Sequence, residues 1–236
     1  MATTTLNLAV FVIGYYITHV GNVLLLFKIN KQRSIYGVSV DAQVMLLLAT
    51  LARIVWIGDT KLLTLTASYV EIALALGLHT ALVVQCLRLK DSFQRENPIY
   101  LRWFVLTAVS AVLSCIFHPG EKGEYFFTQQ MFVSFTMFTE ALSLLAQLHY
   151  MGKAKALEGL NSKYLVALGV ARTSRIYFWY TMSARISTFW YLIAADLIHT
   201  VLVAGFGMLY HFVKVESQGA DGLLGFQGGR AKARFD

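Results

Sequence analysis

The sequence predicts an all-α membrane protein with seven transmembrane helices. Of its 236 residues, 57% are hydrophobic and only 14% are charged, whereas a soluble domain usually carries about 25% charged residues. Seven apolar segments are each close to the length, roughly 20 residues, that crosses a bilayer as a helix. Short connections join them, and none could hold a separate soluble domain. We therefore expect a membrane domain over residues 1–214 and a tail over residues 215–236.

The predicted spans follow one another along almost the whole chain. They cover residues 6–27, 41–58, 62–87, 99–117, 127–150, 164–182 and 186–213. The first segment is long and has no basic residues before it, unlike a cleaved signal peptide. We expect it to be retained as the first span.

Lysine and arginine residues are unevenly distributed over the connections between the spans. One side of the membrane receives Lys28, Lys31, Arg33, Arg88, Lys90, Arg95, Arg102, Lys153, Lys155, Lys163, Lys214, Arg230, Lys232 and Arg234, and the other receives Lys61, Lys122 and Arg185. Because cytoplasmic loops carry the excess of basic residues, the amino terminus is predicted to be lumenal or external and the carboxyl terminus cytosolic. Membrane topology thus accounts for the net charge of +7, and no nucleic-acid partner is expected.

Two loops resemble each other and predict an internal repeat. The stretch "SIYGVSVDAQ" follows the first span and "ALEGLNSKYL" follows the fifth. Arg53 lies sixteen positions after Gly37, and Arg175 lies sixteen positions after Gly159. Spans 1–3 and 5–7 would then be two copies in the same orientation, with the fourth span between them. This arrangement predicts that Arg53 and Arg175 face each other near the pseudo-twofold axis.

Six ionisable residues lie inside apolar segments, where each is energetically costly. They are Arg53, Glu71, Glu140, Arg172, Arg175 and Asp196. Two interpretations stay open: the charges pair with each other and hold the bundle together, or they surround a polar cavity that receives a charged ligand. Arg172 and Arg175 share one helix face, and Trp179 follows Arg175 by four residues, where it could stack on the guanidinium or wall a pocket. Clustered guanidinium groups suit a carboxylate ligand.

The sequence gives no support for catalysis or metal binding. His19, His79 and His199 lie within spans, but no pair has metal-site spacing with supporting cysteine or carboxylate ligands. A histidine in a helix is either a structural hydrogen-bonding group or a proton sensor. Nucleophile-elbow, zinc-protease, P-loop and dinucleotide-binding motifs are missing from the sequence. We therefore expect a protein that is not an enzyme and needs no cofactor or metal.

Three longer stretches resemble one family. "LLLFKINKQRSIYGVSVDAQVMLLLATLAR", "FTEALSLLAQLHYM" and "SKYLVALGVARTSRIYFWY" resemble the first loop and second helix, the fifth helix and the sixth helix of the ER lumen protein-retaining receptors, or KDEL receptors. The resemblance extends from about Gly14 to Lys214. It implies a SWEET/PQ-loop-like fold with a 3+1+3 parallel repeat.

The resemblance also implies a function. These receptors bind the carboxyl-terminal retention signals of ER-resident lumenal proteins, favour acidic pH, and return their cargo from Golgi to ER in retrograde vesicles. This chain would then reside in the ER and Golgi membranes, with its cytosolic tail contacting the vesicle coat. A small-solute transporter on the same fold is the alternative, and a membrane scaffold with purely structural charges is a third possibility.

Residue by residue, the resemblance is incomplete. Arg53 matches the arginine that holds the signal's terminal carboxylate, and Glu140, Arg172 and Trp179 are also retained. Arginines of the family are replaced by Phe11 and Met182, and its sensing histidine by Thr18, which His19 follows. The predicted ligand-binding residues are Arg53, Glu140, Arg172, Arg175 and Trp179, and the candidates for pH sensing are His19 and Glu140. These replacements predict an altered signal preference.

Overall fold

The computed structural model describes residues 2–57, 66–89, 97–118, 129–154, 162–183 and 190–232. The regular structure in these segments is helical, with seven α-helices and one 3-10 helix. They are α1 (Ala2–Gln32), α2 (Val40–Ile57), α3 (Thr66–Arg88), η3 (Ile99–Leu101), α4 (Trp103–Ile116), α5 (Gln129–Ala154), α6 (Ser162–Ser183) and α7 (Trp190–Lys232). Each predicted span overlaps one α-helix, so the all-α prediction is confirmed.

Five of the helices in the described part of the chain are long and apolar enough to cross a membrane: α1, α2, α3, α5 and α7. Helix α4 is apolar but has only 14 residues, which corresponds to about 21 Å. Helix α6 has 22 residues, but Arg172 and Arg175 lower its hydropathy. Large apolar side chains lie on the outer surface of the bundle, as expected for a surface that faces lipid. Examples are Phe27, Val170 and Val201, which are 67%, 50% and 70% exposed.

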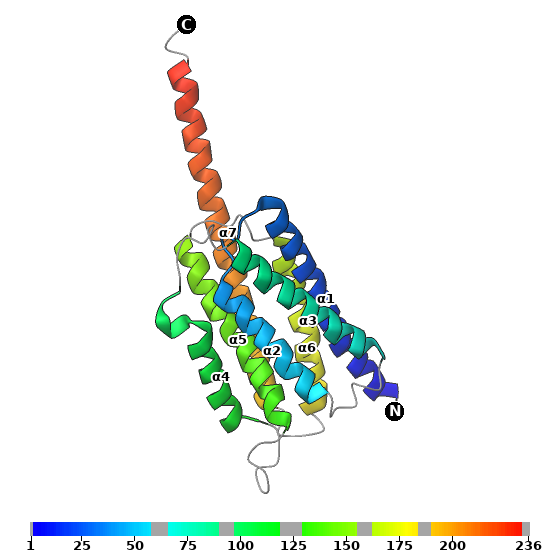
Figure 1. Cartoon of the computed structure of the whole chain (residues 1–236). Helices are drawn as coiled ribbons and strands as arrows, with labels where there is room; N and C mark the ends of the chain where they lie inside the picture. Colours follow the sequence, from blue (N-terminus) through cyan, green and yellow to red (C-terminus); the bar gives the residue numbers. More distant parts are fainter. Residues whose placement is uncertain are drawn as a thin grey trace.

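The helices form a bundle in which the first three, α1–α3, pack against the last three, α5–α7 (Figure 1). Helix α1 packs against α6 and α3, and α2 packs against α5 and α3. Helix α7 packs against α5 and α6, and α4 lies beside α5. Two copies related by a twofold axis would pair α1 with α6 and α5 with α2 in the same way. The repeat itself stays a prediction, and Gly159 in its second loop lies outside the described residues.

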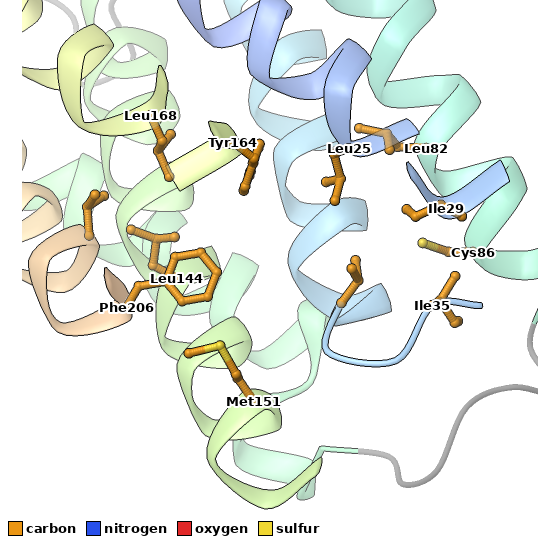
Figure 2. Packing of buried hydrophobic residues seen from close by; sticks show 12 residues of the cluster. Leu25, Ile29, Ile35, Leu82, Cys86, Leu144, Met151, Tyr164, Leu168 and Phe206 are labelled. Carbon is orange, nitrogen blue, oxygen red and sulfur yellow. The ribbon is translucent and has the colours of Figure 1, made fainter. Parts of the chain in front are cut away.

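A mainly apolar cluster fills one end of the bundle (Figure 2). Leu25 and Ile29 from α1 lie near Leu82 of α3, while Leu144 of α5 packs toward Phe206 of α7. A second cluster lies further along the same helices and includes Phe11, Trp56, Phe178, Trp179 and Leu192. The buried charged and histidine side chains of α1, α5, α6 and α7 occupy the stretch of each helix between the two clusters. They are His19, Glu140, Arg172, Arg175, Asp196 and His199. The fold therefore places a polar layer between two apolar layers.

The loop between α1 and α2 is fixed by a side chain from α5. The Gln147 amide nitrogen donates to the carbonyl oxygen of Gly37, and its amide oxygen accepts from the backbone N–H of Ser39 at 2.9 Å. Gly37 has a φ of 86°, a conformation that is easily reached only without a side chain. The Ser39 hydroxyl then caps α2 by accepting from the Ala42 N–H at 3.3 Å. These contacts set the position of α2 and of Arg53 upon it.

Helix α7 continues beyond the bundle to Lys232 and leaves the carboxyl terminus far from the amino terminus (Figure 1). The predicted boundary between membrane domain and tail at residue 214 therefore falls inside a continuous helix. An odd number of spans places the termini at opposite ends, as seen here. Which end is cytosolic stays a prediction, and Lys61, Lys90, Arg95, Lys122, Lys155, Arg185 and Arg234 lie outside the described residues.

Candidate ligand-binding site

Arg53 lies in the polar layer and is paired with a carboxylate from the neighbouring helix. Its Nη2 atom on α2 donates to Oε1 of Glu71 on α3 at 2.8 Å. The same Oε1 atom lies 2.6 Å from Nε2 of His19 on α1. All three side chains are buried. One carboxylate thus joins a guanidinium and an imidazole from three different helices.

Tyr15 brings together the two arginines that the repeat predicts to face each other. The guanidinium carbon of Arg53 lies 3.9 Å from the centre of the Tyr15 ring. The guanidinium carbon of Arg175 lies 5.2 Å from the same centre. Both distances are within the range of a cation–π interaction. The two arginines therefore converge on one aromatic ring of α1.

A second group of charges joins α5, α6 and α7. Oε2 of Glu140 accepts from Nη1 of Arg172 at 2.8 Å and also from Nη1 of Arg175. Oδ1 of Asp196 lies 3.6 Å from Nη1 of Arg172 and 3.2 Å from Nη2 of Arg175. Each of these buried charges has an opposite charge close by, which lowers the cost of its burial. In this structure the charges of the spans pair with each other, so a charged ligand would have to compete with internal partners.

A polar pocket opens between these groups. Its cavity volume is about 30 Å³, so the pocket is small in this structure. Its lining includes four predicted residues, His19, Arg53, Glu140 and Arg172. The other lining residues are Tyr15, Thr18, Asn22, Leu46, Thr50, His79, Tyr164 and Leu168. The structure thus brings together at one pocket residues that the sequence separates by more than 150 positions.

Arg175 and Trp179 have different surroundings from the other predicted site residues. They are not among the residues that line this pocket. Arg175 points to Tyr15, Glu140 and Asp196. The Trp179 ring packs edge-on against Phe178 at 4.9 Å and Phe11 at 5.5 Å between ring centres. The ring placed against Arg175 is therefore that of Tyr15 on a neighbouring helix.

Two positions that depart from the family pattern have apolar or local contacts. Phe11 is buried against Phe178 and Trp179 in the second apolar cluster. Thr18 lines the pocket, but its hydroxyl donates to the carbonyl oxygen of Gly14 in its own helix at 3.2 Å. The side chain of Met182 lies outside the described residues. At position 11 the chain therefore has a buried apolar ring where the resemblance expects a cation.

Sequence reasoning missed a chain of neutral polar contacts beside Arg53. The Asn22 amide nitrogen lies 3.0 Å from Nε2 of His79, and Nδ1 of His79 lies 2.6 Å from the Thr50 hydroxyl. The Thr50 hydroxyl is also 2.9 Å from the carbonyl oxygen of Leu46. With Asn22 and Thr50 as its partners, His79 is satisfied as a neutral imidazole.

A spacing rule in the sequence could have found part of this layer. Six helices carry two buried polar residues three positions apart, which places both on one face. These pairs are His19 and Asn22, Thr50 and Arg53, Ser68 and Glu71, Glu140 and Ser143, Arg172 and Arg175, and Asp196 and His199. Such pairs inside apolar helices predict the face that turns toward the interior of the bundle.

Comparisons with known proteins agree on one family. The family model described as "ER lumen protein retaining receptor" matches residues 34–182, which include Arg53, Glu140, Arg172, Arg175 and Trp179. Among curated proteins, the ER lumen protein-retaining receptor of Dictyostelium discoideum is 25% identical over 209 residues, covering 85% of this chain and 92% of the relative.

Two further relatives carry similar names. The ER lumen protein-retaining receptor of Caenorhabditis briggsae is 27% identical, covering 80% of this chain and 85% of the relative. The ER lumen protein-retaining receptor A of Arabidopsis thaliana is 26% identical, with 80% and 86% covered. The similarity thus extends over most of both chains in each comparison.

Proposed function

Because the chain belongs to the ER lumen protein retaining receptor family, we propose that it is a receptor for carboxyl-terminal ER-retention signals of lumenal proteins. It binds these signals within the ER and Golgi membranes and returns the proteins that carry them to the ER. It acts by binding and sorting and catalyses no reaction. Arg53 at the polar pocket is the observation that carries this proposal.

Arg53 is suited to hold the terminal carboxylate of a peptide. It is 3% exposed and lines the pocket together with Arg172. A guanidinium presents a planar fork of donors that matches a carboxylate, and it cannot lose its charge at physiological pH. Within the described residues, the buried Nε atoms of both arginines have no hydrogen-bond partner. Donors therefore remain for oxygen atoms of a ligand or of water.

The ligand preference of this chain differs from the Lys-Asp-Glu-Leu ending. Phe11 is apolar and packs with Trp179, so it cannot pair with an acidic side chain of the signal. Arg175 supplies a cation from another position but must first release Glu140 or Asp196. The site therefore favours an ending with fewer acidic residues. Acid strengthens binding through His19, because the Glu140 carboxylate is already paired with Arg172 and Arg175.

The topology and the tail complete the proposal. The amino terminus is lumenal and the carboxyl terminus cytosolic, as the distribution of lysine and arginine predicts. The tail after residue 214 then faces the cytosol, where it contacts the coat of retrograde vesicles. The sequence of this tail includes the basic residues Arg230, Lys232 and Arg234.

Binding of a panel of carboxyl-terminal peptides tests the proposal. The purified protein is titrated with free and amidated peptides at pH about 5.5 and about 7.4, on either side of the usual titration range of histidine. We expect some free-carboxylate peptide to bind more tightly in acid and to lose binding when amidated. Equal binding of both forms contradicts the proposal. Flux of a small solute in proteoliposomes, with no peptide bound, assigns the chain to transport instead.

A further inference from the structure

We propose that Glu71 competes with the ligand for Arg53. The Glu71 carboxylate binds the Arg53 guanidinium until the terminal carboxylate of a peptide replaces it. This inference rests on the proposed function, because it concerns the same arginine. It adds a residue of α3 that determines how tightly, and at which pH, the site binds.

The competition follows from burial and charge. Glu71 is 2% exposed and Arg53 is 3% exposed, and their charged atoms are 2.8 Å apart. A ligand carboxylate at this guanidinium would bring a second anion next to Glu71 in a region of low dielectric. Two anions repel strongly in such a place, and one guanidinium compensates only one of them. The ligand therefore binds well only after Glu71 has moved away from Arg53.

His19 gives Glu71 a second partner. Its Nε2 atom is 2.6 Å from the Oε1 atom that also accepts from Arg53. When His19 is protonated, Glu71 gains a cationic partner on α1 and can leave the guanidinium without remaining as an unpaired buried charge. Acid therefore favours the exchange of Glu71 for a ligand.

Other ionisable groups line the pocket that contains His19. They are Tyr15 on α1, Arg53 on α2, His79 on α3, Glu140 on α5, and Tyr164 and Arg172 on α6. Tyr16 of α1 is also near, with its ring centre 6.3 Å from that of His19. The Glu71 carboxylate is the group that directly contacts the imidazole at hydrogen-bonding distance. It is thus the direct electrostatic partner of a protonated His19.

Glu71→Gln tests the competition, because glutamine keeps the shape of the side chain and removes its charge. The probes are a Lys-Asp-Glu-Leu peptide and the tightest binder of the panel, each with a free or an amidated end. We expect the free peptides to bind Glu71→Gln about tenfold more tightly than the wild type at pH about 7.4, because no internal charged hydrogen bond opposes them. The gain should be smaller at pH about 5.5, where His19 already assists release.

Two controls test whether the gain in affinity requires Arg53 and the terminal carboxylate of the peptide. The amidated peptides should gain nothing from Glu71→Gln. In the Arg53→Ala background, Glu71→Gln should restore no binding. A gain that persists for amidated peptides or without Arg53 overturns the proposal.

The remaining outcomes separate this inference from the proposed function. If the wild type binds peptides and a folded Glu71→Gln variant binds them equally or more weakly, Glu71 is not a competitor, while the receptor function stands. If no peptide binds wild type or variant at either pH, the proposed function itself fails. Should Glu71→Gln not fold, His19→Gln serves instead: it should weaken binding several-fold at the acidic pH and little at the neutral one, and an unchanged pH profile overturns the inference.

Discussion

Arg53 lies with its guanidinium carbon 3.9 Å from the centre of the Tyr15 ring. The ring covers one face of the cation while Glu71 occupies one of its edges. A buried guanidinium held in this way has a fixed plane, because both its face and its edge are restrained. A fixed plane is what bidentate recognition of a carboxylate requires.

Arg53→Ala is expected to abolish peptide binding, and Arg53→Lys is expected to restore it poorly. An ammonium group is a point charge and cannot reproduce two parallel hydrogen bonds to one carboxylate. Binding isotherms of both variants measure the effect. Arg53→Ala combined with Glu71→Gln is the control for folding, since it removes the unpaired anion as well. Wild-type affinity of Arg53→Ala for the peptide would remove Arg53 from the site.

Gln147→Leu is expected to lower the free energy of unfolding by about 1–3 kcal/mol, because the Gly37 carbonyl and the Ser39 N–H lose their partner. Gln43→Leu is the matched control. Gln43 is also buried, but its side-chain oxygen has no hydrogen-bond partner within the described residues. Denaturant unfolding in detergent compares the two variants. Equal losses would show that the bonds to the loop contribute little.

Gly14→Ala is expected to destabilise the contact between α1 and α6. A β-carbon at Gly14 would collide with the Ser174 hydroxyl and approach the Ala171 carbonyl oxygen to 3.2 Å. Gly77→Ala is the control, because nothing lies within 4 Å of a β-carbon there. Thermal unfolding should show a loss for Gly14→Ala and none for Gly77→Ala. Ser174→Gly should partly rescue Gly14→Ala, and a failure to do so would locate the strain elsewhere.

Much of the fold and the charged part of the site could be predicted from the sequence. Arg53, Glu140 and Arg172 were identifiable because a charge inside an apolar span is costly and therefore exceptional. The structure places all three at one pocket. Tyr15 and Thr50 carry no such signal, since their residue types are ordinary in membrane helices. Their roles depend on how α1 and α2 are rotated toward their neighbours, which local sequence does not specify.

Trp179 shows where sequence spacing is insufficient. Its position four residues after Arg175 predicts that the two side chains share a helix face. It does not specify which partners the neighbouring helices supply. Phe11 of α1 packs against the Trp179 ring, and the ring centre of Tyr15 on the same helix lies 5.2 Å from the guanidinium carbon of Arg175. Packing between α1 and α6 thus decides the surroundings of both residues.

The predicted topology leads to different protection of the two termini. In sealed microsomes, a tag at the amino terminus should resist added protease, and a tag at the carboxyl terminus should be removed. The expectation follows from the excess of lysine and arginine on the side of the carboxyl terminus. Detergent should expose both tags, which controls for tags that are intrinsically resistant. Removal of both tags in intact vesicles would contradict the seven-span model.

Glu140→Gln is expected to lower the free energy of unfolding by about 3–5 kcal/mol, because two buried arginines would share Asp196 as their remaining acidic partner. Removing one of the two cations should relieve this imbalance. Glu140→Gln combined with Arg175→Met is therefore expected to be more stable than Glu140→Gln alone, although it has lost one more ion pair. Arg172→Met in the same background tests whether the second arginine is equivalent. Unfolding by denaturant measures all three variants. If neither double variant is more stable than the single one, charge balance does not govern this layer, and the loss in Glu140→Gln must be attributed to its individual hydrogen bonds.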